Sequence, residues 1–261
     1  MTAPSPIVVK IGGSTLGKHD TSLEDLAALH REGHALVVVH GGGATVSEWL
    51  AIHGVESRFV RGLRVTDERA LQVVVAVLAG VVNKELVARL NALGARAMGL
   101  TGADGAIIRA RRYDPDLGHV GEIVCVGAEA LRSLLAAGFL PVLAPIGLEA
   151  QGQTSQPHLL NINADTAAAE VARALAASHL IFLTDVPGVH DARGRIIYNV
   201  SAEGARDLVA SGAAGGGMIP KLEAALRAID AGTRALIIDG RREHALQTAL
   251  QGEVTGTVIG P

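Results

Sequence analysis

The chain has few aromatic residues, one cysteine and no excess of basic charge. Aromatic side chains make up 2% of its 261 residues, so the core must be built from Ala, Val, Leu and Ile. A net charge of −3 provides no basic footprint for nucleic acid, and the few aromatics offer bases little to stack on. Cys125 has no second cysteine for an intramolecular disulfide, and we expect it to pack in the core.

Targeting and membrane-spanning patterns are also missing. Residues 1–6 lack a basic stretch followed by an apolar one, so no signal peptide is predicted. The longest apolar run, Val73–Val82, is shorter than the roughly 20 residues that cross a bilayer. We expect it to form a helix buried on several sides, in the core or between subunits. These patterns predict a cytoplasmic protein with neither a membrane nor a nucleic acid as partner.

Short β-branched runs alternate with helical stretches along most of the sequence. The runs are continuously apolar, as in strands that are covered on both faces. This alternation predicts an α/β fold with a mostly parallel sheet between helical layers. The expected strands are Ile7–Ile11, Ala35–His40, Ala95–Leu100, Pro141–Ala144, Leu180–Thr184 and Ala235–Asp239.

Several helix ends can be read from the sequence. Thr21 has capping-box spacing to an acidic residue, and Gly33 stands where that helix closes. Thr66 can cap a helix that opens with two acidic residues. Pro220 fits the first turn of a helix running to about Ala231.

Two regions depart from the alternation. Ile107–Val126 contains a turn-rich insert between short extended pieces, and we expect hairpins that protrude from the sheet edge. A new strand–helix series starts near Ala176–Ser178, which predicts a boundary between two lobes there.

Three glycine runs lie beside the ends of predicted elements, and two of them have a lysine nearby. Glycine lets backbone N–H groups close on an anion, and a lysine adds a positive charge. Loops that follow neighbouring strands of an open α/β sheet converge at its ligand-binding edge. Ordinary tight turns are the alternative for each run alone, but together they favour an enzyme that transfers a phosphoryl group. The segments are Lys10–Gly13, His40–Gly43 and Gly215–Lys221.

Well-known phosphate motifs are absent. Gly212 and Gly217 have the spacing of a P-loop, but Met218 occupies the position of its lysine. No Gly-x-Gly-x-x-Gly follows the first strand, and protein-kinase signatures are missing. The ten histidines show no metal-site spacing, so no zinc site is predicted.

Three further segments carry polar groups that suit a binding site. Asn161–Asp165 precedes an alanine-rich helix, so Asp165 or Asn163 could cap that helix. Asp165 could instead hold the two lysines or bind a metal ion that accompanies a nucleotide. The fork of Arg64 suits a carboxylate, although a solvated surface ion pair is the alternative. Thr184–Val189 fits either a nucleotide-contacting loop or an ordinary Pro-Gly turn.

Taken in order, these segments resemble the N-acetylglutamate kinases of the amino acid kinase family. The resemblance runs from the first predicted strand to the last. It is carried by Lys10-Ile11-Gly12-Gly13, His40-Gly41-Gly42-Gly43, Gly62-Leu63-Arg64-Val65-Thr66, Gly118-His119-Val120-Gly121, Asn161-Ile162-Asn163-Ala164-Asp165, Thr184-Asp185-Val186-Pro187-Gly188-Val189 and Gly216-Gly217-Met218-Ile219-Pro220-Lys221.

The resemblance implies an open αβα sandwich of two lobes. Residues 1–176 would bind the amino acid and pair subunits, and residues 177–261 would bind ATP. With Mg²⁺ held mainly by ATP, the γ-phosphoryl group would pass to the side-chain carboxylate of N-acetyl-L-glutamate. That reaction is the second step of arginine biosynthesis.

The family's site residues map onto matching positions. Lys10 and Lys221 would stabilise the transferring phosphoryl group from its two sides, and Asp165 would orient both lysines. The acetylamino acid would be held by Gly42, Gly43, Arg64 and Asn161. The nucleotide would be bound or bordered by Gly12, Gly13, Thr184, Asp185, Val186, Pro187, Gly188, Val189, Ala213, Ala214 and Gly215. No protein ligand for a metal is implied.

One departure from the family bears on assembly. Arginine-inhibited members carry an extra N-terminal helix that joins dimers into hexamers, whereas six residues precede the first strand here. The resemblance therefore implies a homodimer that arginine does not regulate by this route. Val73–Val82 lies in the segment that pairs subunits in the family.

Two alternative functions stay open at this point. Glutamate, aspartate, carbamate and uridylate kinases share parts of the scaffold, and a kinase for carrier-linked aminoadipate is the nearest rival. One methylene separates its substrate from glutamate, a difference worth about 1–3 kcal/mol to a binding site. No basic cluster for a carrier is seen near Arg64. A catalytically silent ligand sensor is disfavoured because Lys10, Lys221 and Asp165 are all present.

Overall fold

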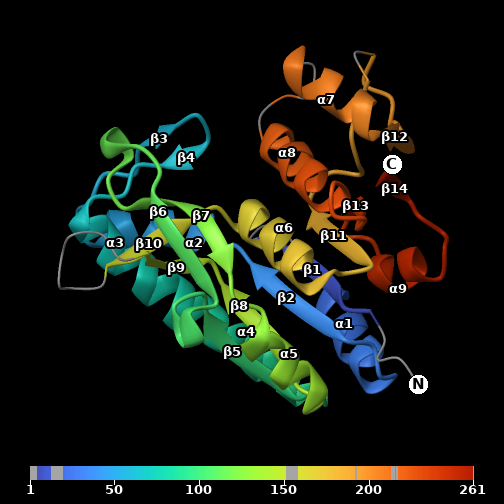
Figure 1. Cartoon of the computed structure of the whole chain (residues 1–261), viewed down its shortest axis with the longest axis horizontal. Coiled ribbons are helices and arrows are strands. Elements are labelled where there is room, and N and C mark those ends of the chain that lie inside the picture. Colours follow the sequence, from blue (N-terminus) through green and yellow to red (C-terminus); the bar gives the residue numbers. More distant parts are fainter. Residues whose placement is uncertain are drawn as a thin grey trace.

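A central eight-stranded sheet organises the molecule (Figure 1). The computed structural model describes residues 5–12, 20–150, 158–191, 193–212, 215 and 217–260. The strands run parallel except at the β12–β14 edge, where β14 is antiparallel to β13 and parallel to β12. The mostly parallel α/β sheet is therefore confirmed. Its strands, in spatial order, are β12 (Asn199–Ser201), β14 (Gly256–Gly260), β13 (Arg234–Asp239), β11 (His179–Thr184), β1 (Ile7–Ile11), β2 (Leu36–His40), β8 (Leu140–Ala144) and β5 (Ala97–Thr101).

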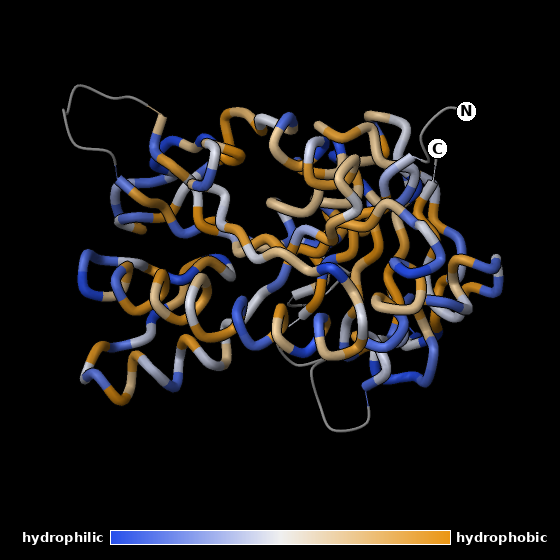
Figure 2. The backbone as a smooth tube through the Cα atoms, turned by 90° about the horizontal axis from the view of Figure 1, so that it is seen from below, coloured by the Kyte–Doolittle hydropathy of each residue, from blue (hydrophilic) through white to orange (hydrophobic). Residues whose placement is uncertain are grey.

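Helices cover both faces of this sheet, so each strand needs apolar side chains on both sides. Figure 2 shows the hydrophobic stretches gathered along the central strands and the hydrophilic ones at outer turns. One face packs against α5 (Glu129–Ala136), α6 (Ala164–Leu175), α7 (Ala202–Ala210) and α8 (Met218–Ile229). The other packs against α1 (Ser22–Arg31), α2 (Gly43–Ile52), α3 (Glu68–Val75), α4 (Asn83–Ala92) and α9 (Ala245–Leu250).

The alternation of side chains along β1 decides which way its lysine points. Val8 belongs to the core beneath α6, and Val9 belongs to the core beneath α1. Side chains two residues apart on a strand share a face, so Lys10 lies on the α6 side with Val8. The first strand thus delivers its cation to the start of α6.

A long helical stretch, Glu68–Ala92, is formed by α3, a π-helical segment η2 (Ala76–Val82) and α4. By length and composition alone this stretch could cross a membrane. One side of it packs in the core through Val74, Val77, Leu78, Val82, Leu86 and Leu90. The apolar run Val73–Val82 is helical as predicted, with Ala76 and Gly80 exposed in the single chain.

A second, smaller sheet lies over the start of α6. Its strands close in the order β10 (Leu159–Ile162), β7 (Val120–Val126), β6 (Ile108–Arg112) and β9 (Ile146–Glu149). The predicted hairpin is confirmed, because β6 and β7 pair antiparallel. The prediction that it protrudes from the sheet edge is wrong. Ile108, Ala110, Leu160 and Ile162 are buried in the same core as α6, so these strands gain more by closing on one another.

The smaller elements complete the fold. A short hairpin follows α2, and two 3₁₀ turns flank β6. They are β3 (Phe59–Val60) paired with β4 (Leu63–Arg64), η3 (Asp104–Ala106) and η4 (Pro115–Leu117).

Three sequence-based expectations about single residues are wrong. The Thr21 side chain does not cap α1, because its hydroxyl accepts a hydrogen bond from the His244 N–H at 2.7 Å. Asp67 caps α3 in place of Thr66, which is buried and donates to the Arg64 carbonyl. Cys125 is exposed on β7 rather than packed in the core. Pro220 does lie in the first turn of α8, which ends at Ile229.

Candidate active site

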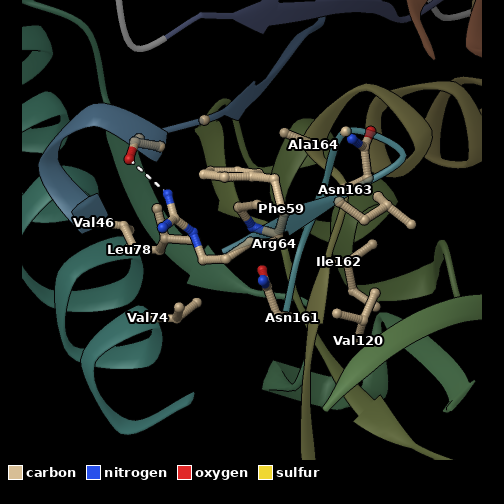
Figure 3. A pocket seen from close by; sticks show the side chains of 16 residues that line it. Val46, Phe59, Arg64, Val74, Leu78, Val120, Asn161, Ile162, Asn163 and Ala164 are labelled. Carbon is tan, nitrogen blue, oxygen red and sulfur yellow. Dashed lines mark hydrogen bonds between the residues drawn. The ribbon is translucent and has the colours of Figure 1, made fainter. Parts of the chain in front are cut away.

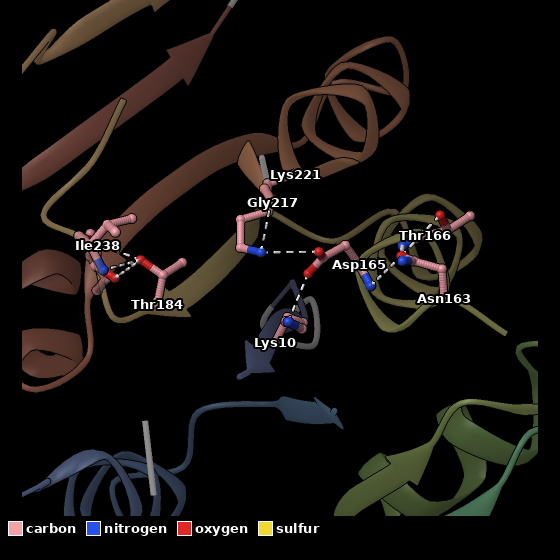
Figure 4. Close-up of polar contacts among 9 residues, drawn as sticks. Lys10, Asn163, Asp165, Thr166, Thr184, Gly217, Lys221 and Ile238 are labelled. Atoms are coloured by element: carbon pink, nitrogen blue, oxygen red, sulfur yellow. Dashed lines mark hydrogen bonds and ion pairs between the residues drawn. The ribbon is translucent and has the colours of Figure 1, made fainter. Parts of the chain in front are cut away.

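A buried carboxylate lies between two lysine ammonium groups at the start of α6 (Figure 4). Asn163 caps this helix, its side-chain oxygen accepting from the N–H groups of Asp165 and Thr166 at 2.9 and 3.0 Å. The Asp165 carboxylate is therefore not needed as a cap. One of its oxygens forms an ion pair with Lys10 Nζ at 2.9 Å, and the other accepts a hydrogen bond from Lys221 Nζ at 3.2 Å.

The charges of this cluster do not balance. The Asp165 and Lys10 side chains are 8% exposed and that of Lys221 is 17% exposed, so all three are largely removed from water. Burial by itself raises the pKa of Asp165, but the two ammonium groups more than offset this and hold its pKa below the usual range. One anion between two cations leaves a positive excess, which favours binding of a further anion.

A cavity of about 150 Å³ is lined in part by Asn163 and Ala164, which directly precede Asp165. Figure 3 shows the side chains that line it. The glycine loop at the start of α2, Arg64 of β4 and Asn161 of β10 supply its polar lining. A cavity of this size is smaller than the roughly 300–1,000 Å³ of drug-sized sites and suits a small metabolite. Its apolar wall consists of Val46, Phe59, Val74, Leu78, Val120 and Ile162.

Arg64 brings a buried cation into this cavity without an acidic partner. One of its terminal nitrogens donates to the Gly43 carbonyl and to Ser47 Oγ, each at 2.9 Å, and the other donates to Ser57 Oγ. Its guanidinium lies 4.6 Å from the centre of the Phe59 ring. Within the described ranges no carboxylate forms an ion pair with it, and burial lowers its pKa. A guanidinium stays charged even so, and a ligand carboxylate would complete its coordination.

The neighbouring groups of this cavity are fixed in place. Asn161 donates to Thr66 Oγ1 at 3.1 Å, and that hydroxyl donates to the Arg64 carbonyl at 2.8 Å. Gly42 has φ 157°, and a Cβ there would lie 2.7 Å from Leu78. Only glycine allows the loop to pass so close to η2.

A second cavity, of about 310 Å³, is lined in part by Lys221. Thr184 shapes its loop, since its hydroxyl donates to the Val186 carbonyl at 2.8 Å. Pro187 and Gly188 turn the chain without lining the cavity, and a Cβ at Gly188 would meet Thr257 Oγ1 at 2.7 Å. The lining residues are Thr184, Asp185, Val186, Val189, His190, Asp191, Gly215, Gly217, Met218 and Lys221.

The lysine–aspartate cluster adjoins the linings of both cavities. Asn163 and Ala164 line the first cavity, Asp165 follows them directly, and its partner Lys221 lines the second. A ligand in each cavity would therefore approach the same buried cations. Nine of the predicted binding residues line the two cavities, four in the first and five in the second, because loops distant in sequence converge here, as expected at the carboxyl ends of strands.

Some predicted residues are not tested by this geometry. Gly13, Ala213 and Ala214 lie outside the described residues. The Gly12 N–H donates to the Leu183 carbonyl at 3.3 Å, which extends the β1–β11 pairing by one residue. The sequence did not single out Phe59, His190 or the apolar wall, because their positions depend on how the loops fold. Among the described residues, no group of three or more His, Cys, Asp or Glu side chains could hold a metal ion.

Comparison with known proteins identifies the class. The model of the amino acid kinase family matches residues 5–239, and the chain belongs to this family. A carbamate kinase from Giardia lamblia bound to AMP-PNP shares the fold, with a TM-score of 0.69 at 16% identity over 99% of both chains.

Within this family the chain is similar to acetylglutamate kinases. The acetylglutamate kinase of Dehalococcoides mccartyi is 46% identical over 257 residues, which cover 97% of this chain and 93% of that protein. The crystal structure of smu.665 from Streptococcus mutans superposes with a TM-score of 0.83 at 29% identity, over 98% of both chains.

Proposed function

We propose that this protein is an ATP-dependent kinase that phosphorylates the side-chain carboxylate of N-acetyl-L-glutamate, in the second step of arginine biosynthesis. The observation that carries the proposal is the Lys10–Asp165–Lys221 cluster between a small cavity with an unpaired arginine and a second cavity lined by Lys221. The similarity to acetylglutamate kinases over nearly the whole chain supports the choice of substrate.

The chemistry requires positioning and charge rather than a base. A side-chain carboxylate with an ordinary pKa near 4.3 is ionised at neutral pH and is already a nucleophile. This carboxylate must approach the negatively charged triphosphate of ATP. The negative charge on the transferring phosphoryl group must also be stabilised. Lys10 from the first cavity's side and Lys221 from the second supply that support, and Asp165 keeps the two ammonium groups apart and aimed.

The first cavity orients the amino acid. Arg64 attracts its α-carboxylate by charge, since the guanidinium has no carboxylate partner in the described part of the chain and bonds only to Ser57, Ser47 and the Gly43 carbonyl. Asn161 and the N–H groups of Gly42 and Gly43 hold the remaining polar groups. The second cavity takes ATP, with Thr184 to Val189 and Gly215 at its border.

We propose that Mg²⁺ binds together with ATP. Asp165, the carboxylate that the described residues place between the two lysines, is already engaged by both of them, so it suits a positioning role better than metal binding. The donor groups present therefore fit a cation held mainly by nucleotide phosphates, where it supplies charge neutralisation.

Assembly and location are part of the same proposal. The exposed apolar side of η2, with Ala76 and Gly80, would pair subunits in a homodimer. Residues 1–176 would serve the amino acid and residues 177–261 the nucleotide, in the cytoplasm. Light scattering tests the dimer, and a stable hexamer would contradict it.

A hydroxylamine trap for acyl phosphate tests the activity. The protein is incubated with Mg-ATP and, in parallel, N-acetyl-L-glutamate, L-glutamate, L-aspartate or N-acetyl-aminoadipate. We expect hydroxamate from N-acetyl-L-glutamate alone, with its formation reduced about 10²–10³-fold in Lys10→Ala and Lys221→Ala. Arg206→Ala is the matched control, because it removes an exposed cation that pairs with Asp230 away from the cavities.

The other outcomes separate the alternatives. Hydroxamate from a different acid would keep the phosphoryl-transfer mechanism and replace the substrate. Binding of Mg-ATP without hydroxamate from any acid would refute the kinase and favour a ligand sensor. Unchanged activity in Lys10→Ala would refute the role given to the lysine–aspartate cluster.

A further inference from the structure

A buried histidine stands directly before the glycine loop of the first cavity. His40 ends β2 and is 1% exposed. Its Nδ1 lies 2.8 Å from the Gly41 carbonyl oxygen, and its Nε2 lies 3.1 Å from the side-chain nitrogen of Asn83. Both ring nitrogens therefore have partners inside the protein.

The partners define the state of the ring. A carbonyl oxygen can only accept, so Nδ1 must carry the hydrogen. The amide nitrogen of Asn83 can only donate, so Nε2 must be the acceptor. His40 is thus a neutral imidazole with its hydrogen on Nδ1. Burial, with a smaller effect of the Lys84 ammonium on α4, lowers its pKa to about 4, although the hydrogen bond to the Gly41 carbonyl acts in the opposite direction.

Asn83 is itself held from several directions. It is fully buried at the start of α4, and its side-chain nitrogen also donates to the Val142 carbonyl of β8 at 2.9 Å. Its oxygen accepts from Lys84 Nζ at 3.0 Å. A Cβ at Gly99 would lie 2.0 Å from that oxygen, so β5 makes room for the network with a glycine.

The hydrogen bond from His40 controls a peptide group of the site. The Gly41 carbonyl and the Gly42 N–H belong to one trans peptide, so they point in opposite directions. When His40 holds the carbonyl toward the interior, the Gly42 N–H is turned the other way, toward the cavity that Gly42 lines. In the part of the chain that the structure describes, no group accepts a hydrogen bond from this N–H.

We infer that His40, held by Asn83, is a positioning residue that aims the Gly42 N–H at the anion in the first cavity. The carbonyl of Gly43 is also held, by Arg64 and Ser47 Oγ, at 2.9 and 3.0 Å. Hydrogen bonds to the carbonyls of Gly41 and Gly43 thereby fix the loop on both sides of Gly42. This inference rests on the proposed kinase function for the identity of the anion.

Substitutions at His40 test the aim of this N–H. His40→Leu removes the donor to Gly41, whereas His40→Asn keeps a side-chain N–H close to the position of Nδ1. We expect His40→Leu to lower kcat about 10–10²-fold, less than the full loss of an oxyanion donor, with both KM values within about threefold. His40→Asn should recover most of the loss. If His40 only filled space in the core, His40→Asn would not restore kcat, because restoration depends on the N–H that Asn keeps.

Asn83 provides a second, matched test. Asn83→Asp places an acceptor opposite Nε2, so the ring must gain a proton there and the pKa of His40 should rise. Asn91→Asp is the control, since Asn91 is exposed at the far end of the same helix. We expect a new ionisation in the pH dependence of kcat for Asn83→Asp and none for Asn91→Asp.

A measurement on the wild-type protein tests the inference even if the variants fail to fold. Nitrogen-15 NMR of labelled histidine should show a His40 ring that is protonated on Nδ1 and does not titrate between pH 8 and 5.5. The opposite tautomer, or a folded His40→Leu with wild-type kcat, would overturn the inference. Absence of acyl phosphate from the wild type would instead refute the proposed function, while the NMR result would still report on His40.

Discussion

The burial of His40 should make the stability of this protein depend on pH in a way that can be isolated. Its pKa is lowered from 6.5 to about 4 because the ring is buried. In the unfolded chain the same group takes up a proton below about pH 6.5. Below that pH the unfolded state therefore binds more protons than the folded state, and stability falls as the pH falls toward 4.

The size of this effect follows from the shift. At 1.36 kcal/mol per pH unit, the full penalty below pH 4 is about 3 kcal/mol, and about 2 kcal/mol of it is reached at pH 5. Total stabilities of domains are about 5–15 kcal/mol, so such a loss is measurable. Above pH 7 the contribution disappears, since His40 is neutral in both states.

Urea unfolding at pH 7.5 and pH 5 provides the assay. Other groups also titrate in this range, so the quantity of interest is the difference between wild type and His40→Asn, which has no ring to protonate. We expect the wild type to lose about 2 kcal/mol more than the variant between the two pH values. Equal losses would refute the neutral buried ring.

Three further predictions concern other parts of the molecule. Asp165→Asn removes the anion between the two ammonium groups, and steady-state kinetics should show kcat lowered about 10²–10³-fold. Gly42→Ala places a methyl group against Leu78 and should cost about 1–3 kcal/mol in urea unfolding, whereas Gly204→Ala on α7, where a Cβ would meet nothing nearer than 3.4 Å, should cost nothing. The pKa of His244 is raised by its hydrogen bond to a buried carboxylate of α1, so its contribution is present below pH 6.5 and lost as pH rises. The stability advantage of wild type over His244→Gln should therefore shrink from pH 6 to pH 8.

The strands that the sequence predicts well are those with a simple local cause. Continuous apolar runs such as Leu180–Leu183 supply apolar side chains to both faces, as a parallel strand covered on both faces requires. The short strands β12 and β14 were missed because their burial depends on pairing at the sheet edge rather than on their own composition. Closure of β6, β7, β9 and β10 likewise depends on pairing between distant segments.

Capping errors have a similar origin. Thr21 has the spacing of a capping box, yet its hydroxyl is used by His244 from more than two hundred residues away. The sequence pattern left Asp165 and Asn163 as equal candidates for the cap of α6. The structure separates them because Asn163 accepts two backbone hydrogen bonds, which leaves Asp165 for the lysines.

Within the site, charged and glycine residues could be predicted, and the cavity walls could not. Lysine, arginine and glycine carry chemistry that few other residues provide, so their type alone marked Lys10, Arg64 and Lys221. Leu78 and Phe59 look like any apolar residue until the loops are folded against them. The role of Asn83 also depends on three strands that meet around it.

The unbroken sheet has a mechanical consequence for how the two ligands could be admitted. β1 pairs with β2 on one side and with β11 on the other, in continuous register, so backbone hydrogen bonds join these three strands directly. We therefore expect a movement that widens the gap between the cavities to bend these paired strands. The strands should return to the same conformation when the ligands leave. We therefore expect the β1–β11 ladder to limit how far Lys10 moves relative to the strands beside it.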